Sequence, residues 1–176
     1  TYTGASTLDA DTVTGAASEN AQTIWEYSSR TLTQSAASVA TAVAGATITI
    51  TRGDTLSAAI TDIGALTGYV SIDWTVKEAR SDSDDNAIIR IRLNASGLND
   101  GLLRINKAAA ANSALGSITV DDAATGDITI ALDATMTDDL EIQTLDYDIQ
   151  LITATAVTTM SLGTANVVAD VTRAVT

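Results

Sequence analysis

Short runs in which apolar and polar residues alternate recur through the last three quarters of the chain. The clearest run covers 69–77, where every second residue is apolar. Because side chains alternate between the two faces of a β-strand, this run predicts a strand with one buried face. The runs 87–93 and 145–152 repeat the pattern. We expect their apolar members to form the core: Val70, Ile72, Trp74, Val76, Ile89, Ile91, Tyr147 and Ile149.

Glycine, asparagine and aspartate separate further runs of the same kind. Strands spaced roughly ten residues apart, with turn residues between them, are typical of an antiparallel β-sandwich. The pattern therefore predicts an all-β fold over 46–176. One helical turn is expected at Met136–Leu140, with Thr137 as its cap. The additional predicted strands are 47–51, 56–63, 102–105, 117–120, 127–132, 157–162 and 165–171.

Residues 1–45 lack these alternating runs with turn residues between them, and we interpret them as an N-terminal arm. Ser18 is a good N-cap for a short helix over about 18–29, and Ser35–Gly45 forms an Ala/Ser-rich linker. A segment with so few large side chains stabilises itself poorly, which favours docking onto a neighbour. The helix would present an apolar stripe that we expect to make assembly contacts: Ile24, Trp25 and Tyr27.

Composition narrows the possible functions. The chain has 22 acidic residues, 9 basic residues and a net charge of −13, and it contains no His or Cys. Metal sites built on thiolate or imidazole are excluded. So much negative charge, without a basic cluster, also argues against nucleic acid and anionic membranes as partners. No apolar run approaches the ~18 residues that a membrane-spanning helix needs.

Candidate catalytic chemistry is sparse. A Ser or Thr nucleophile needs a base, and without His only Lys77 and Lys107 remain, neither in a Ser-x-x-Lys arrangement. Glycoside hydrolysis needs two carboxylates at a defined separation, and the sequence singles out no such pair. We therefore expect a protein that is not an enzyme and uses no cofactor.

Two short motifs resemble binding sites. Arg52-Gly53-Asp54 lies between two strand-like runs, which favours a structural turn over an exposed recognition triplet. Asp82, Asp84 and Asn86 imitate the first half of a calcium loop. Because Ala87 stands where glycine is needed, a solvated turn is favoured over a metal site.

Arg90 and Arg92 alternate on the polar face of the run 87–93. They are two of only nine basic residues in a very acidic chain. One interpretation is a basic strip that fits an acidic patch on a neighbouring copy and fixes its register. The other is an ordinary solvated face, and both remain open at this point.

Five segments follow one another along the chain: Ile50–Thr55, Leu66–Gly68, Thr125–Ile128, Asp146–Gln150 and Asp170–Arg173. In this order they resemble the Ig-like sandwich of tailed-phage structural proteins. That family includes the N-terminal domain of upper baseplate proteins and related tail-fibre attachment domains. An upstream segment, Ile24–Thr33, is similar to one that recurs in phage tail and fibre proteins. The chain departs from the family at Thr153–Ala156, where a Gly-rich dipeptide is usual, and in its few aromatics.

The resemblance implies a structural component of a tailed-phage virion, made in the host cytoplasm. The expected role is a baseplate or tail-fibre building block that self-assembles through its arm and its sheet edges. Its expected partners are copies of itself and other virion proteins. Two alternatives remain: a capsid decoration or repeating extracellular filament subunit, and a receptor- or glycan-binding module on the virion surface.

Overall fold

The described part of the chain, residues 43–170 of a computed structural model, folds into two β-sheets. The predicted helix at 18–29, with Ile24, Trp25 and Tyr27, lies outside the described residues. The larger sheet has the strand order β1-β11-β10-β4-β5-β6-β7, with β2 also paired to β11, and the smaller sheet has the order β3-β9-β8. The strands are β1 Val43–Ala44, β2 Ile48–Thr51, β3 Leu56–Ile60, β4 Ser71–Lys77, β5 Ile89–Asn94, β6 Gly101–Ile105, β7 Ala108–Ala109, β8 Gly116–Asp122, β9 Asp127–Leu132, β10 Thr144–Ile152 and β11 Val157–Val168.

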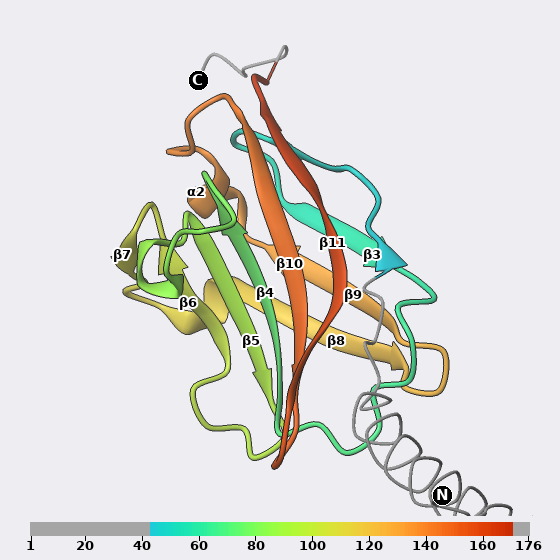
Figure 1. Cartoon of the computed structure of the whole chain (residues 1–176). Helices are drawn as coiled ribbons and strands as arrows, with labels where there is room; N and C mark the ends of the chain where they lie inside the picture. Colours follow the sequence, from blue (N-terminus) through green and yellow to red (C-terminus); the bar gives the residue numbers. More distant parts are fainter. Residues whose placement is uncertain (1–42, 171–176) are drawn as a thin grey trace, which may run out of the picture. The chain divides into compact units, whose positions relative to one another are not determined.

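The strand order is that of an immunoglobulin-like sandwich. In variable-type domains one sheet is formed by strands C″, C′, C, F and G, and the facing sheet contains B, E and D. Here β6-β5-β4-β10-β11 and β3-β9-β8 reproduce these two sets. The larger sheet lies in front of the smaller one in Figure 1. The all-β sandwich predicted from the sequence is therefore confirmed.

Trp74 on β4 is fully buried at the centre of the core. Its ring centroid lies 6.4 Å from that of Tyr147 on the adjacent strand β10, with the planes tilted by 58°. In antibody domains a disulfide between the strands equivalent to β3 and β10 packs against a Trp at this place. This chain has no Cys, so apolar side chains fill the space instead.

Seven of the eight residues expected in the core lie there: Ile72, Trp74, Val76, Ile89, Ile91, Tyr147 and Ile149. The prediction for Val70 is wrong, because its side chain is 44% exposed. Val70 precedes the first residue of β4 and joins the sheet only through backbone hydrogen bonds with Ile152 and Ala95. The alternation therefore extends one residue beyond the buried part of the strand.

The last two predicted strands are one strand. β11 runs without interruption from Val157 to Val168 through Gly163, which the sequence pattern had suggested as a break. Gly163 is the cross-strand partner of Tyr147. A Cβ on Gly163 would lie 2.6 Å from two carbon atoms of the Tyr147 ring. The glycine is therefore present because the tyrosine ring covers it, and not because the strand ends.

The single helical turn also differs from the prediction. α2 covers Ala134–Thr137, two residues earlier than expected, and its N-cap is Asp133. The Asp133 carboxylate accepts hydrogen bonds from the backbone and hydroxyl of Thr135. These bonds lower the pKa of Asp133. Thr137 is buried inside the turn, and its one hydroxyl proton is shared between the carbonyls of Asp54 at 2.8 Å and Ala134 at 2.9 Å, so it is not the cap.

The larger sheet begins inside the segment that the sequence analysis assigned to the arm. Val43 and Ala44 form β1, which pairs in parallel with Ser161 and Leu162 of β11. β2 then continues along the same strand, pairing with Ala165–Val168. No helix among residues 43–170 is long and apolar enough to cross a bilayer.

Candidate functional site

The outward face of the larger sheet carries a layer of polar side chains that we call the outer polar layer. Strand β4 supplies its centre, β5 lies on one side and β10 on the other. The register places Asp73 opposite Arg92 on β5 and opposite Gln150 on β10. Because alternate residues share a face, the layer also includes Thr75, Lys77, Arg90, Asp146 and Asp148.

Asp73 is the most buried charged group of this layer, with 2% of its side chain exposed. Arg92 binds both of its carboxylate oxygens, through Nε to Oδ1 and Nη2 to Oδ2, each at 2.7 Å. Arg90 approaches Oδ2 from the same strand, with Nη2 at 2.7 Å and Nε at 3.2 Å. One buried carboxylate is therefore held by two guanidinium groups.

The electrostatics of this cluster favour the charged state of the Asp73 carboxylate. Burial alone would raise the pKa of Asp73, but the hydrogen bonds from Arg92 and Arg90 outweigh it, so its pKa lies below the usual value. The hydrogen bond to Asp73 likewise raises the pKa of Arg92. Charge-assisted bonds of this kind are stronger than neutral ones and fix the register of β4 and β5.

The two arginines were open to two interpretations, and the structure shows a third arrangement. Arg90 and Arg92 are engaged within the domain by Asp73, and their side chains are only 17% and 23% exposed. Neither is simply a solvated charge. The alternation within 69–77 puts Asp73 on the face opposite the apolar residues and does not reveal that it is buried. A signal for this role was present in the sequence. One predicted strand contains Asp73, the following one contains Arg90-x-Arg92, and antiparallel pairing of the two strands brings these side chains together.

The acidic motif at residues 82–86 is a turn. Asp84 begins the 3₁₀ turn η1, Asp84–Asn86, and pairs with Lys77 Nζ at 2.8 Å and Arg90 Nη2 at 3.4 Å. Asp82 accepts a hydrogen bond from the backbone of Ala79. The structure thus surrounds Asp84 with cations of the domain itself. Within residues 43–170 no three acidic side chains converge as a metal site would require.

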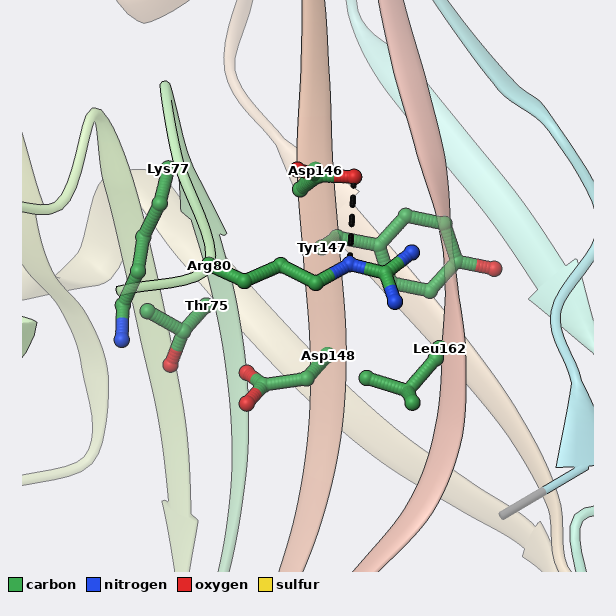
Figure 2. Close-up of a pocket in the computed structure, with 7 residues that line it drawn as sticks. All are labelled: Thr75, Lys77, Arg80, Asp146, Tyr147, Asp148 and Leu162. Atoms are coloured by element: carbon green, nitrogen blue, oxygen red, sulfur yellow. Dashed lines mark hydrogen bonds and ion pairs between the residues drawn. The ribbon is translucent and has the colours of Figure 1, made fainter. Parts of the chain in front are cut away.

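A small cavity opens beside the outer polar layer. Its volume is about 180 Å³ and its walls include Arg80, Asp146 and Asp148 (Figure 2). Arg80 reaches across it and pairs with Asp146, Nε to Oδ1, at 3.3 Å. Asp148 accepts a hydrogen bond from Gln150 at 2.8 Å, and burial raises its pKa. The remaining lining residues are Thr75, Lys77, Tyr147 and Leu162.

A second hollow of about 340 Å³ is polar and more open. Lys107 on its rim pairs with Glu78 at 2.8 Å, which raises the pKa of the lysine. Drug-sized ligand sites usually measure about 300–1,000 Å³ and have aromatic walls. The first cavity is smaller and the second has no aromatic residue among its walls, which are Glu78, Ile88, Asn106, Lys107, Asp139, Glu141 and Gln143.

The chemistry of these groups is that of ion pairing and hydrogen bonding. Within residues 43–170 no Ser or Thr hydroxyl shares a hydrogen bond with a Lys amine. Lys77 and Lys107, the candidate bases, are both bound to carboxylates. The arrangement can therefore hold strands together and receive small polar groups.

The Arg52-Gly53-Asp54 triplet forms the turn between β2 and β3. Gly53 has a positive φ of 78°, and the backbone N–H of Asp54 donates to Thr51 at 3.2 Å. The Arg52 side chain is bound to the rest of the domain, because its Nε donates to the carbonyl of Asp138 at 2.9 Å. The triplet is therefore the predicted turn between two strands, and Gly53 and Asp54 are exposed in it.

Comparisons with known proteins give matches to solved structures. No family model matches the chain, and no curated protein matches it. Among solved structures, the extracellular portion of mouse CD200RLa is similar, with 14% sequence identity and a TM-score of 0.37. The match covers 70% of this chain and 56% of that one, so the chain spans little more than half of that structure's length. The assignment to the immunoglobulin-like sandwiches rests on the strand order.

Proposed function

We propose that this chain is a structural, self-assembling component of a tailed-phage virion, a building block of the baseplate or of a tail fibre. The virion context comes from the segments that resemble phage structural proteins. Four of them lie in the described sandwich: Ile50–Thr55, Leu66–Gly68, Thr125–Ile128 and Asp146–Gln150. Two observations of the fold then bear on the role. They concern the use of charge and the size of the cavities.

The observation that carries the proposal is the use of charge in the outer polar layer. Asp73, Arg90 and Arg92 bind one another, and Lys77 is bound to Asp84. These side chains serve the stability of the sheet, as expected in a protein whose role is mechanical and not catalytic. The small cavities agree with this role, since neither has the size and walls of a usual ligand pocket.

The first experiment is light scattering of the purified full chain, with negative-stain imaging of the same sample. We expect a mass several times the 18.0 kDa of one chain, in rings, fibres or filaments of regular outline. A compact monomer at all concentrations would contradict self-assembly.

The virion context needs a separate experiment. Particles from the host that carries the gene would be purified by density gradient and probed with an antibody against this chain. We expect a signal at one end of the particle for a baseplate or fibre protein. A signal over the head would favour capsid decoration instead, and no signal on intact particles would overturn the proposal.

A further inference from the structure

The free edges of the two sheets are not protected equally. Proteins shield exposed edge strands with charge, bulges or shortness, because unpaired N–H and C=O groups accept another strand. At the edges of the larger sheet, β7 has two residues, and β1 and β2 have two and four. At one edge of the smaller sheet, β8 carries a bulge between Val120 and Asp122 and ends in two acids.

Strand β3, at the other edge of the smaller sheet, has none of these protections. Its register with β9 is continuous from Leu56 to Ile60, without a bulge. Its sequence, Leu-Ser-Ala-Ala-Ile, contains no charge and no Pro, although the chain has 22 acidic residues. Ser57 and Ala59 are exposed and small, so a second strand could approach closely. Within residues 43–170 no strand pairs with this edge, which is on the outside of the sandwich in Figure 1.

We propose that the edge of β3 receives an extended strand from a second copy of this chain, supplied by residues 31–42. The inference rests on the proposed function and names the surface through which copies join. Residues 31–51 contain no charged side chain. Such a strand matches an uncharged edge in a strongly acidic protein, and strand addition of this kind needs mainly backbone hydrogen bonds.

The path of the chain favours a second copy over the same copy. Val43 pairs with Ser161, and from there β1 and β2 run along β11 towards Val168. After the turn at Arg52–Thr55, β3 returns along the facing sheet. By Gly64 the chain has reached the level of Met160, since a Cβ on Gly64 would lie 3.2 Å from the Met160 methyl carbon. The chain thus enters beyond the end of β3, and its preceding residues would have to double back to reach their own edge.

Symmetric pairing of two β3 strands is less favourable than addition of the uncharged segment 31–42. Asp54 and Asp62 flank the strand and are exposed. Antiparallel self-pairing centred on Ala58 would align Asp54 of each copy with Asp62 of the other. Like charges directly opposite each other destabilise a strand pair. An uncharged segment avoids this repulsion.

The first test measures association of the full chain by sedimentation over a series of concentrations. Ala59→Lys places a charge on the proposed edge, and Thr119→Lys places one on an exposed position of the shielded strand β8 as a matched control. We expect Ala59→Lys to raise the dissociation constant about tenfold or more, equivalent to ~1.4 kcal/mol, with Thr119→Lys near wild type. Urea unfolding of both variants verifies that each is folded.

A second test identifies the donor segment. Because the chain has no Cys, introduced cysteines are unique. Full-length Ala59→Cys would be mixed with a tagged full-length chain carrying one cysteine in the donor segment, at Ser35, Ala37, Val39 or Thr41 in turn. We expect a mixed disulfide at one or two of these positions, and none when the donor cysteine is replaced by Thr3→Cys.

The outcomes separate the two proposals. If the full chain associates but Ala59→Lys does not weaken association, the β3 inference fails while self-assembly stands. If the full chain is monomeric throughout, both fail. A further full-length chain carries Ala59→Cys together with one of the donor cysteines. If this chain closes an internal disulfide while none of the four mixtures gives a mixed one, the segment pairs in its own copy and the exchange between copies is overturned.

Discussion

At the scale of single residues, the most consequential side chain is Asp73. It lies on the outward face of a sheet but is almost fully buried, because Arg90 and Arg92 fold over it from the adjacent strand. A buried charge is tolerated only when partners satisfy it. Removing one member of such a cluster leaves the others uncompensated, and this cost exceeds the net contribution of the intact cluster.

We expect Asp73→Asn to lower the free energy of unfolding by about 3 kcal/mol, measured by urea denaturation at pH 7, because two half-buried guanidinium groups lose their counter-charge. The matched control is Asp85→Asn, whose carboxylate pairs with Arg104 but is 80% exposed. Exposed pairs contribute little, so the control should unfold near the wild-type midpoint. Equal effects of the two substitutions would contradict the role given to Asp73.

The same carboxylate gives a pH dependence. The folded-state pKa of Asp73 is lowered, so its contribution is fully present above the unfolded-state value of about 3.9. The contribution is lost as the pH falls through the lower folded-state value. The stability difference between wild type and Asp73→Asn should therefore be constant from pH 7 to 5 and shrink below about pH 4.

At the scale of elements, alternation in the sequence was enough to locate most strands of the sandwich and seven of the eight chosen core residues. Alternation failed where tertiary contacts determine the end of a strand or the burial of a side chain. The pattern predicts a strand end at Gly163, because glycine usually interrupts a strand, whereas the Tyr147 ring requires glycine there. The burial of Asp73 depends on β4 and β5 being neighbours, and alternation within one strand does not reveal its neighbours.

Gly163 gives the prediction at this scale. Valine favours strands in general, yet Gly163→Val should destabilise the domain by about 1–3 kcal/mol, because its Cβ would overlap the Tyr147 ring. Thr158→Val on the same strand is the control, since Thr158 is only half-buried there, and it should be neutral or slightly stabilising. Thermal unfolding of both variants measures the difference. A neutral Gly163→Val would show that the tyrosine ring can move aside.

At the scale of the whole molecule, the charge of −13 opposes any assembly of identical copies. Salt screens repulsion between distant surface charges, with a Debye length of about 10 Å at 0.1 M. The proposed junction at β3 is uncharged, so salt should not weaken it directly.

We therefore expect association of the full chain to strengthen as NaCl rises from 0.02 to 0.3 M at pH 7, as measured by light scattering. The reason is that repulsion is screened while an uncharged strand pairing is retained. The comparison is the same series near pH 4.1, close to the isoelectric point, where the salt effect should largely vanish. Association that weakens with salt at pH 7 would indicate a junction built on ion pairs.

The absence of a disulfide between β3 and β10 has a further consequence. A sandwich that depends on that bond is complete only after an oxidant has acted, and its stability follows the thiol chemistry of its surroundings. Here Trp74 and its apolar neighbours complete the core without it. Dithiothreitol and air alike should leave the melting curve unchanged, so the sandwich does not need an oxidising compartment to mature.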